Sequence, residues 1–184
     1  FPNRNSDELV ERVGKEVAKG EGWAQLFMAN LYGSGTFVKE DLRKAEDLLT
    51  AAVQSEWPQA LQLRAEQYYH GTYGSPDFSA AYKLFVAAAA KGVMKAHAYL
   101  GYMLRAGQGV VADAREARKH FELAASAGEI GAAAEYGWEL LTADEKPDAA
   151  GVAYVSYAAA RNSVVGLTYL GVCRSEGMEI EADQ

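Results

Sequence analysis

Residues 96–128 read AHAYLGYMLRAGQGVVADAREARKHFELAASAG and contain one complete copy of a repeated pattern. Its pattern returns along the chain, since steps of 36 residues from Ala96 reach Ala24, Ala60 and Ala132, and one step of 34 reaches Gly166. Small residues follow five positions after each anchor, and in three copies an aspartate stands at the seventeenth position. A fixed period of this length indicates a stack of supersecondary units, none of which can bury its own apolar face alone.

The first half of each unit is expected to be a helix that packs closely on a neighbour. Ala96, Leu100 and Gly101 fall on one side of such a helix at helical spacing. Glycine inside a helix costs about 1 kcal/mol relative to alanine. Its recurrence at Gly101, Gly137 and Gly171 therefore predicts that another helix axis passes there too close for a methyl group.

The second half of each unit has start and stop signals of a second helix. Asp113 followed by Glu116 predicts a capping box, and Ser75-Pro76-Asp77 predicts an N-cap with proline in the first turn. Glu56 interrupts the column of expected left-handed stop residues, so Trp57-Pro58 is expected to end that helix instead. The other stop residues are expected at Gly20, Gly92, Gly128 and Asn162.

The pattern as a whole predicts ten helices in one repeat domain over residues 1–184. The first helix, with Ser6 as its expected N-cap, is of the second type without a first helix of its own; it would be an N-terminal cap or the remnant of an upstream repeat. The other helices are expected near 21–33, 41–55, 57–70, 77–91, 93–106, 113–127, 129–142, 147–161 and 163–175. The expected parts are a capping helix (1–20), repeats (21–56, 57–92, 93–128, 129–162), a C-terminal helix (163–175) and an acidic tail (176–184).

These residues resemble the Sel-one-like repeat, a relative of the tetratricopeptide repeat, over roughly residues 20–175. The resemblance implies an all-α, right-handed α-α superhelix of four to five helix-turn-helix repeats, whose first helices line a concave surface. It also implies members that bind other proteins as adaptors, in signalling, secretion, envelope biogenesis and toxin neutralisation. The matching residues in one copy are Ala96, Leu100-Gly101, Gly107-Gln108-Gly109-Val110, Asp113, Ala117 and Ala124-Ala125-Ser126-Ala127-Gly128.

Composition narrows the classes of partner. A net charge of −7 and a pI near 5.0 disfavour nucleic acid, because binding to phosphates relies on clustered lysine and arginine. The apolar runs are shorter than the ~18 residues of a membrane span. Because the chain starts at Phe1 rather than methionine, removal of an export signal and truncation of a longer chain both stay open, and so do a periplasmic and a cytoplasmic location.

The sequence gives little indication of catalysis, metal binding or a cofactor. His70, His97 and His120 lack the spacing that would put two imidazoles on one helical face, and we expect ordinary surface or inter-helix histidines. Cys173 is the single cysteine, which excludes an intrachain disulfide; we expect a small packed hydrophobe rather than a nucleophile. A hydrolase activity of the cysteine-rich branch of the family is therefore not transferred. We expect no catalytic residue, no metal site and no cofactor.

One face of the first helices carries side chains that a solvated helix would not show. Aromatic and apolar residues recur at the third and sixth positions after the anchors, and we expect them to line a concave groove that binds a partner protein. The alternative is that superhelical curvature packs them as core, above all Phe27, Leu63 and Tyr169. The full expected set is Trp23, Phe27, Asn30, Leu63, Glu66, Tyr99, Tyr102, Glu135, Trp138 and Tyr169, with Glu66, Glu135 and also Glu176 at the edge of the aromatic stripe.

Three classes of function follow from these observations. The favoured one is a non-catalytic protein-binding module, either an adaptor or an inhibitor or immunity protein for a secreted effector, with a secreted effector or an envelope component as partner. The alternative is a small-ligand receptor or hydrolase that uses the same groove. A structural or oligomerising array would need an exposed apolar end, and the acidic tail disfavours it mildly. That tail is either a solvated end or an acidic docking segment.

Overall fold

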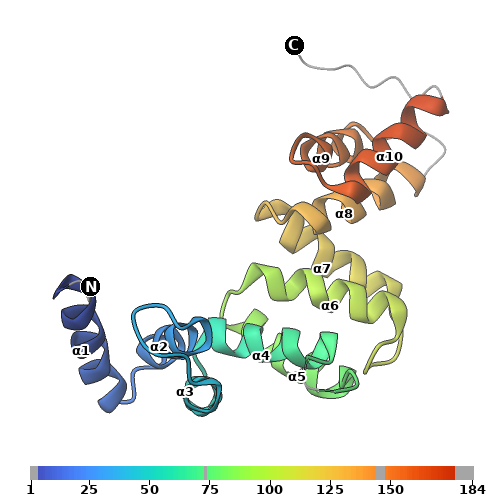
Figure 1. Cartoon of the computed structure of the whole chain (residues 1–184). Coiled ribbons are helices and arrows are strands. Elements are labelled where there is room, and N and C mark those ends of the chain that lie inside the picture. Colours follow the sequence, from blue (N-terminus) through green and yellow to red (C-terminus); the bar gives the residue numbers. More distant parts are fainter. Residues whose placement is uncertain (1–3, 73, 144–147, 177–184) are drawn as a thin grey trace. The chain divides into compact units, whose positions relative to one another are not determined.

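The computed structural model describes residues 4–72, 74–143 and 148–176, with the side chains of residues 4 and 5 left out (Figure 1). These residues form ten helices and no strand, so the predicted all-α repeat fold is confirmed. The helices are α1 (Arg4–Ala18), α2 (Gly22–Ser34), α3 (Leu42–Gln54), α4 (Pro58–His70), α5 (Phe78–Ala90), α6 (Met94–Ala106), α7 (Ala114–Ser126), α8 (Ile130–Thr142), α9 (Ala149–Ala160) and α10 (Val164–Ser175).

The helices group into two compact units, residues 1–93 and 94–184, called unit 1 and unit 2 below. In unit 1, α1 packs on α2, α2 on α3 and α4 on α5. In unit 2, α6 packs on α7 and α8 on α9, while α10 lies against α8 and α9. We call α2, α4, α6, α8 and α10 first-type helices, and α1, α3, α5, α7 and α9 second-type helices. The single repeat domain with its expected repeat boundaries stays a prediction.

The second-type helices α3, α5 and α7 begin at capping aspartates. Asp41, Asp77 and Asp113 each accept a hydrogen bond at 2.9–3.0 Å from the backbone N–H three residues later. Such a cap stabilises a helix by about 1 kcal/mol, which explains why an aspartate recurs at this position. The Asp113 cap is confirmed. Pro76 precedes the cap at Asp77, so the expectation of proline in the first turn was wrong.

The stop residues are confirmed, with one correction at Glu56. Gly92 has a φ of 84°, Gly128 of 87° and Asn162 of 60°, all in the left-handed region. Glu56 also has a positive φ, 54°, so it ends α3 itself and Trp57-Pro58 does not. Backbone hydrogen bonds from Glu56 to the carbonyl of Val53 and from Trp57 to that of Ala52 satisfy the last turn, which offsets the strain of a non-glycine residue there.

The N-terminus of α1 differs from the sequence prediction. Ser6 was expected to cap the helix, but α1 begins at Arg4 and the Ser6 side chain is buried. The helix ends at Ala18, and Gly20 after it adopts a φ of 83°, as expected for a stop residue.

Of the predicted acidic tail, the structure describes Glu176. The rest of the tail, including Glu179, lies outside the described residues.

The glycine column separates two real helix contacts from one open position. A Cβ on Gly101 would lie 2.7 Å from the Phe121 ring, and one on Gly137 would lie 2.8 Å from the carbonyl oxygen of Gly151, so close packing is confirmed at both. Gly171 is exposed, and a Cβ there would meet no described heavy atom within 4 Å. The predicted contact at Gly171 was wrong, because both helices that pack on α10 belong to the preceding repeat and leave this face open.

Cys173 lies in the small hydrophobic core of unit 2. It is 1% exposed and packs with Leu141 and Val155, as expected for a small hydrophobe. Burial raises the pKa of its thiol, which keeps it protonated at neutral pH and disfavours a nucleophilic role.

The glycine column predicts that alanine substitutions at two equivalent positions change the free energy of unfolding in opposite directions. Gly137→Ala should lower the free energy of unfolding by about 1–3 kcal/mol, because the new methyl group overpacks the contact between α8 and α9. Gly171→Ala should raise it by about 0.5–1 kcal/mol, because only the entropic cost of glycine is removed. Urea denaturation of both variants checks this, and equal signs would contradict the contact pattern.

Candidate functional site

The ten expected binding residues all lie on first-type helices, and the structure treats the two units differently. Unit 1 contains Trp23, Phe27, Asn30, Leu63 and Glu66, and unit 2 contains Tyr99, Tyr102, Glu135, Trp138 and Tyr169. In unit 1, Trp23 and Phe27 are 40% and 38% exposed. In unit 2, none of the five is exposed, and most of them contact one another or a neighbouring helix.

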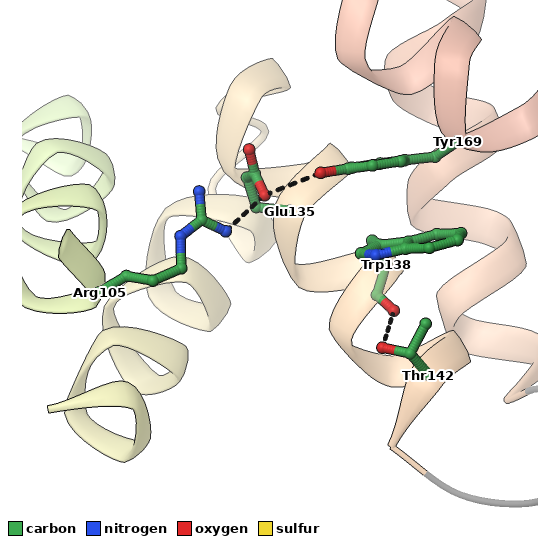
Figure 2. A network of polar contacts seen from close by, with 5 residues as sticks. All are labelled: Arg105, Glu135, Trp138, Thr142 and Tyr169. Carbon is green, nitrogen blue, oxygen red and sulfur yellow. Dashed lines mark hydrogen bonds and ion pairs between the residues drawn. The ribbon is translucent and has the colours of Figure 1, made fainter.

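Glu135 joins three first-type helices of unit 2 (Figure 2). Arg105 on α6 donates to its carboxylate at 2.6 Å, and the Tyr169 hydroxyl on α10 donates to the same oxygen at 3.3 Å. Glu135 is only 6% exposed, although the sequence suggested that it edges an exposed stripe. A carboxylate this buried needs partners of this kind to remain charged. The network therefore connects α6, α8 and α10 within unit 2.

Trp138 and Tyr169 form a stacked aromatic pair beside this network (Figure 2). Their ring centroids lie 4.6 Å apart and their planes differ by 11°. The hydroxyl of Thr142 donates to the Trp138 carbonyl at 2.9 Å. Both aromatic rings are half-buried between α8 and α10, which is the core-packing alternative that the sequence left open for Tyr169.

Large side chains also fill the space between α6, α7 and α8. The Tyr102 and Phe121 rings meet edge to face at 5.0 Å. The Arg105 guanidinium lies 5.1 Å from the centroid of Phe121 and 5.5 Å from that of Tyr102. Because Arg105 also pairs with Glu135, the side chains from the three helices close this space. Arg105 and Phe121 were not among the expected binding residues, although their positions recur in each copy of the repeat.

The equivalent space in unit 1 is an open cleft. Two repeats before Tyr102, Arg105 and Phe121, the chain has the smaller Asn30, Gly33 and Leu49. The cleft between α2, α3 and α4, called the α2–α4 cleft below, measures about 530 Å³. It is lined by Ala29, Asn30, Gly33, Ser34, Leu42, Ala45, Glu46, Leu49, Leu63 and Gln67.

The α2–α4 cleft has an apolar floor and a polar rim. Ala29 and Leu49 are buried beneath it, whereas Asn30 and Ser34 on its rim are exposed. Glu46 is the one ionisable side chain among the described residues that line the cleft, and Arg64 pairs with it at 2.6 Å. The described residues that line the cleft therefore do not bring together several titratable groups, as acid–base catalysis requires. Of the expected residues, Asn30 and Leu63 line the cleft and Glu66 does not.

A second cavity, of about 510 Å³, lies between α1 and α2, and we call it the α1–α2 cavity. Trp23 and Phe27 line it from α2. Leu9, Arg12, Val13, Lys15 and Glu16 line it from α1. The first two expected residues therefore face a different space from Asn30 and Leu63.

His97 and His120 form a pair that the sequence analysis did not bring together. The Nδ1 atoms lie 2.8 Å apart, on α6 and α7. Because one nitrogen must donate and the other accept, this hydrogen bond needs the accepting ring to be neutral, and protonation of both rings would break it. Burial lowers the pKa of each imidazole, and the neighbouring His97 lowers that of His120 further. His70 is exposed at the end of α4, in unit 1.

The chain matches the family model of the Sel1 repeat over residues 24–55, 58–93 and 95–129, more than half of its length. It belongs to the Sel1 repeat family. Proteins of this family generally act as non-catalytic scaffolds for protein–protein interaction. Within the described part of the chain, no group of three metal-ligating side chains comes together, and no helix is both long and apolar enough to span a membrane.

One protein sequence and two solved structures are similar to this Sel1 repeat chain. It is 32% identical over 172 residues to an exopolysaccharide production negative regulator of Rhizobium leguminosarum bv. viciae, covering 86% of this chain and 64% of that protein. Thus it spans just under two thirds of this relative. A Sel1 repeat protein from Oxalobacter formigenes superposes with a TM-score of 0.80 at 23% identity, over 97% of this chain and 74% of the other. A protective antigen of uropathogenic Escherichia coli with an SLR fold superposes with a TM-score of 0.79 at 28% sequence identity. This match covers 94% of this chain and 37% of the antigen.

The Glu135 network predicts a loss of stability when one partner is removed. Arg105→Met keeps the apolar stem and removes the charge, so Glu135 is left buried with a single hydrogen-bond donor. We expect the free energy of unfolding to fall by about 1–3 kcal/mol at neutral pH, less than for a fully buried pair because Arg105 is half-exposed. A double-mutant cycle with Glu135→Gln measures the coupling. Additive effects of the two substitutions would exclude it.

The histidine pair predicts a loss of stability in mild acid. Because both pKa values are lowered by folding, the unfolded chain binds more protons below about pH 6.5. The stability that the pair contributes should therefore be fully present above that pH and be lost as the pH falls through it. Of the neighbouring charges, Glu116 raises the pKa of His120 and Lys119 lowers it. Urea midpoints from pH 8 to pH 5, approximately, measure the slope.

The variants with the pair replaced provide the control. His97→Gln with His120→Gln should flatten the slope, while His70→Gln removes an exposed histidine outside the pair. An unchanged slope in the double variant would show that the pair does not cause the acid sensitivity.

Proposed function

We propose that this Sel1 repeat chain is a non-catalytic module that holds an extended segment of a partner protein in the α2–α4 cleft. The observation that supports this most is the difference between equivalent positions in the two units. Tyr102, Arg105 and Phe121 close the space in unit 2, whereas Asn30, Gly33 and Leu49 leave it open in unit 1. A repeat that needed this space only for stability would gain from filling it.

The chemistry of the cleft suits a peptide with one large apolar side chain. Its volume of about 530 Å³ lies within the range of sites that enclose ligand groups. An apolar side chain would lose water against Ala29, Leu49 and Leu63, at about 25 cal/mol per Å² of buried surface. The exposed Asn30 carboxamide has both donors and an acceptor, which matches the N–H and C=O groups of an extended backbone. The segment therefore binds through its backbone and one anchoring side chain.

A small-ligand receptor or hydrolase is the second candidate class. It would need a more enclosed site, and a hydrolase would also need converging titratable groups. The exposed rim at Asn30 and Ser34 and the existing pair of Glu46 with Arg64 favour the protein partner.

The specific role we favour is that of a regulatory adaptor. The Rhizobium relative is named a negative regulator of exopolysaccharide production, and this chain is similar to it over most of its own length. A scaffold without catalytic groups acts on such a process by holding another protein. The inhibitor or immunity role against a secreted effector remains the alternative form of the same binding activity, and an envelope component remains a candidate partner.

The remaining expected residues receive different roles in this proposal. Asn30 and Leu63 contact the bound segment. Tyr102, Glu135 and Tyr169 support the packing of unit 2, since their polar or aromatic groups already contact protein neighbours. Tyr99 is half-buried on α6, and Trp138 lies on α8 and stacks against Tyr169. Both take the same supporting role.

The test is to close the cleft with the side chains that close the equivalent space in unit 2. Asn30→Tyr with Gly33→Arg should leave the fold intact, because a Cβ on Gly33 has only the Ala45 methyl at 3.8 Å, and losing a helix glycine is favourable. Partner binding should weaken by at least about tenfold, which is about 1.4 kcal/mol. The partner is first identified by a photo-crosslinking residue at position 30, followed by mass spectrometry.

Gln54→Tyr is the matched control, because Gln54 is exposed on α3 and does not line the cleft. It should bind the partner as the parent does, and a crosslinker at position 54 should not capture it. Full affinity of the closed variant, with an unchanged melting temperature, would exclude the α2–α4 cleft as the site.

A further inference from the structure

The first and last described helices of the repeat array both leave apolar surface uncovered. In unit 1, Trp23 and Phe27 are exposed on the α1–α2 cavity. In unit 2, Val164 and Leu167 on α10 are 79% and 50% exposed, and Gly171 lies on the same side of that helix. Exposed apolar surface of this kind marks sites of protein–protein contact. These two surfaces are therefore candidate docking sites.

The exposed side of α10 is the side on which a second-type helix packs elsewhere in unit 2. Gly101 on α6 packs on Phe121 of α7, and His97 packs on His120. The equivalent residues on α10 are Gly171 and Leu167, five positions and one position after the anchor. Gly171 thus lowers helix stability as glycine does inside any helix, although no helix among the described residues packs against it. Among the described residues, no element covers this face of the first-type helix α10.

The α1–α2 cavity is the complementary half of the same arrangement. α1 is a second-type helix, because Leu9 and Val13 stand 36 residues before Ala45 and Leu49. Trp23 and Phe27 occupy the positions that Gly131 and Glu135 hold in α8. On α8 these positions face the preceding first-type helix, since a Cβ on Gly131 would lie 3.0 Å from the Tyr102 hydroxyl and Glu135 pairs with Arg105. The cavity therefore has the place and the walls for a first-type helix.

We propose that α10 of a second copy of this chain docks in the α1–α2 cavity and completes a repeat between the two copies. The side-chain sizes favour this occupant. Between α6 and α8, large residues on the preceding helix meet Gly131 and Glu135. In the docked arrangement the order reverses, because α10 presents the smaller Val172 and Ser175 at the positions of Tyr102 and Arg105, opposite Trp23 and Phe27. The side chains thus exchange sizes across the contact.

The contact joins two different surfaces, so the association is heterologous. Each copy has one α10 face and one α1–α2 cavity, and a dimer formed in this way still exposes one of each unless a ring closes. The average mass in solution should therefore rise with concentration beyond the 19.9 kDa of one chain. Leu167 and Gly171 of one copy would meet Arg12 and Val13 of the other, by equivalence with the contact of α6 with α7.

Two single variants test the proposal, each blocking one surface. Phe27→Lys puts a charge into the cavity, and Leu167→Lys puts one on the docking face of α10. Sedimentation velocity over about a hundredfold range of concentration should show the parent chain associating and each variant alone as a monomer. An equimolar mixture should form a 1:1 dimer that does not grow, because the free α10 of the Phe27→Lys chain fits the free cavity of the Leu167→Lys chain.

Leu123→Lys is the matched control, since Leu123 on α7 is 48% exposed and lies on neither surface. It should associate as the parent does, and Trp23→Lys should repeat the effect of Phe27→Lys. A parent chain that stays monomeric throughout, single variants that still associate, or a mixture without dimers would each overturn the proposal. The variant with a closed α2–α4 cleft should associate normally, so the outcome is independent of the proposed function.

Discussion

The close approach between the two helices of a repeat is the contact on which the structure depends. At Gly101 and Gly137 the absence of a side chain lets a second-type helix come within reach of the first-type backbone. Helices of 12 or 13 residues are too short to be stable alone in water, so this contact supplies what propensity does not. The capping aspartates and left-handed stop residues then set where the second helix begins and ends. In these two repeats the helix pair is therefore held together at a glycine, whereas the first two repeats have alanine, Ala29 and Ala65, at the equivalent position.

The space between two first-type helices and the second-type helix that they share determines what a repeat can do. In unit 2 this space holds Tyr102, Arg105 and Phe121, and the Glu135 carboxylate is buried with the arginine as its partner. Such a network is specific but costly, because desolvating the charge offsets much of the attraction. In unit 1 small side chains leave the space open, which gives up packing energy. The same backbone arrangement therefore gives a structural repeat in one unit and a candidate binding repeat in the other.

Features that depend on local chemistry could be predicted from the sequence, and features that depend on partners distant in sequence could not. The period, the cap at Asp113 and the ten helices follow from residues close together along the chain. The burial of Glu135 could not be predicted, because its partner Arg105 lies 30 residues away on another helix. The pairing of His97 with His120 was missed for the same reason.

The error at Gly171 has a different origin. The glycine column was assumed to mean a helix contact in every copy, yet no second-type helix among the described residues packs on α10 at Gly171. The α2–α4 cleft, in contrast, was accessible from the sequence. A comparison of side-chain volumes at Asn30, Gly33 and Leu49 with those of the later copies would have indicated an open space. Column-by-column volume is therefore a better guide to function in such arrays than the presence of aromatic residues alone.

The two proposed occupants of unit 1 would lie next to each other on α2. Trp23 and Phe27 face the α1–α2 cavity, and Asn30, one turn after Phe27, lines the α2–α4 cleft. A helix docked in the cavity and a segment bound in the cleft therefore approach the same helix face from neighbouring sides. Any interaction free energy between them acts equally on both equilibria, since coupling between two binding events is reciprocal. If the two occupants repel each other, partner binding dissociates the assembled copies. If they attract each other, each stabilises the binding of the other. The side chains that the partner places beside Phe27 set the sign of this interaction free energy.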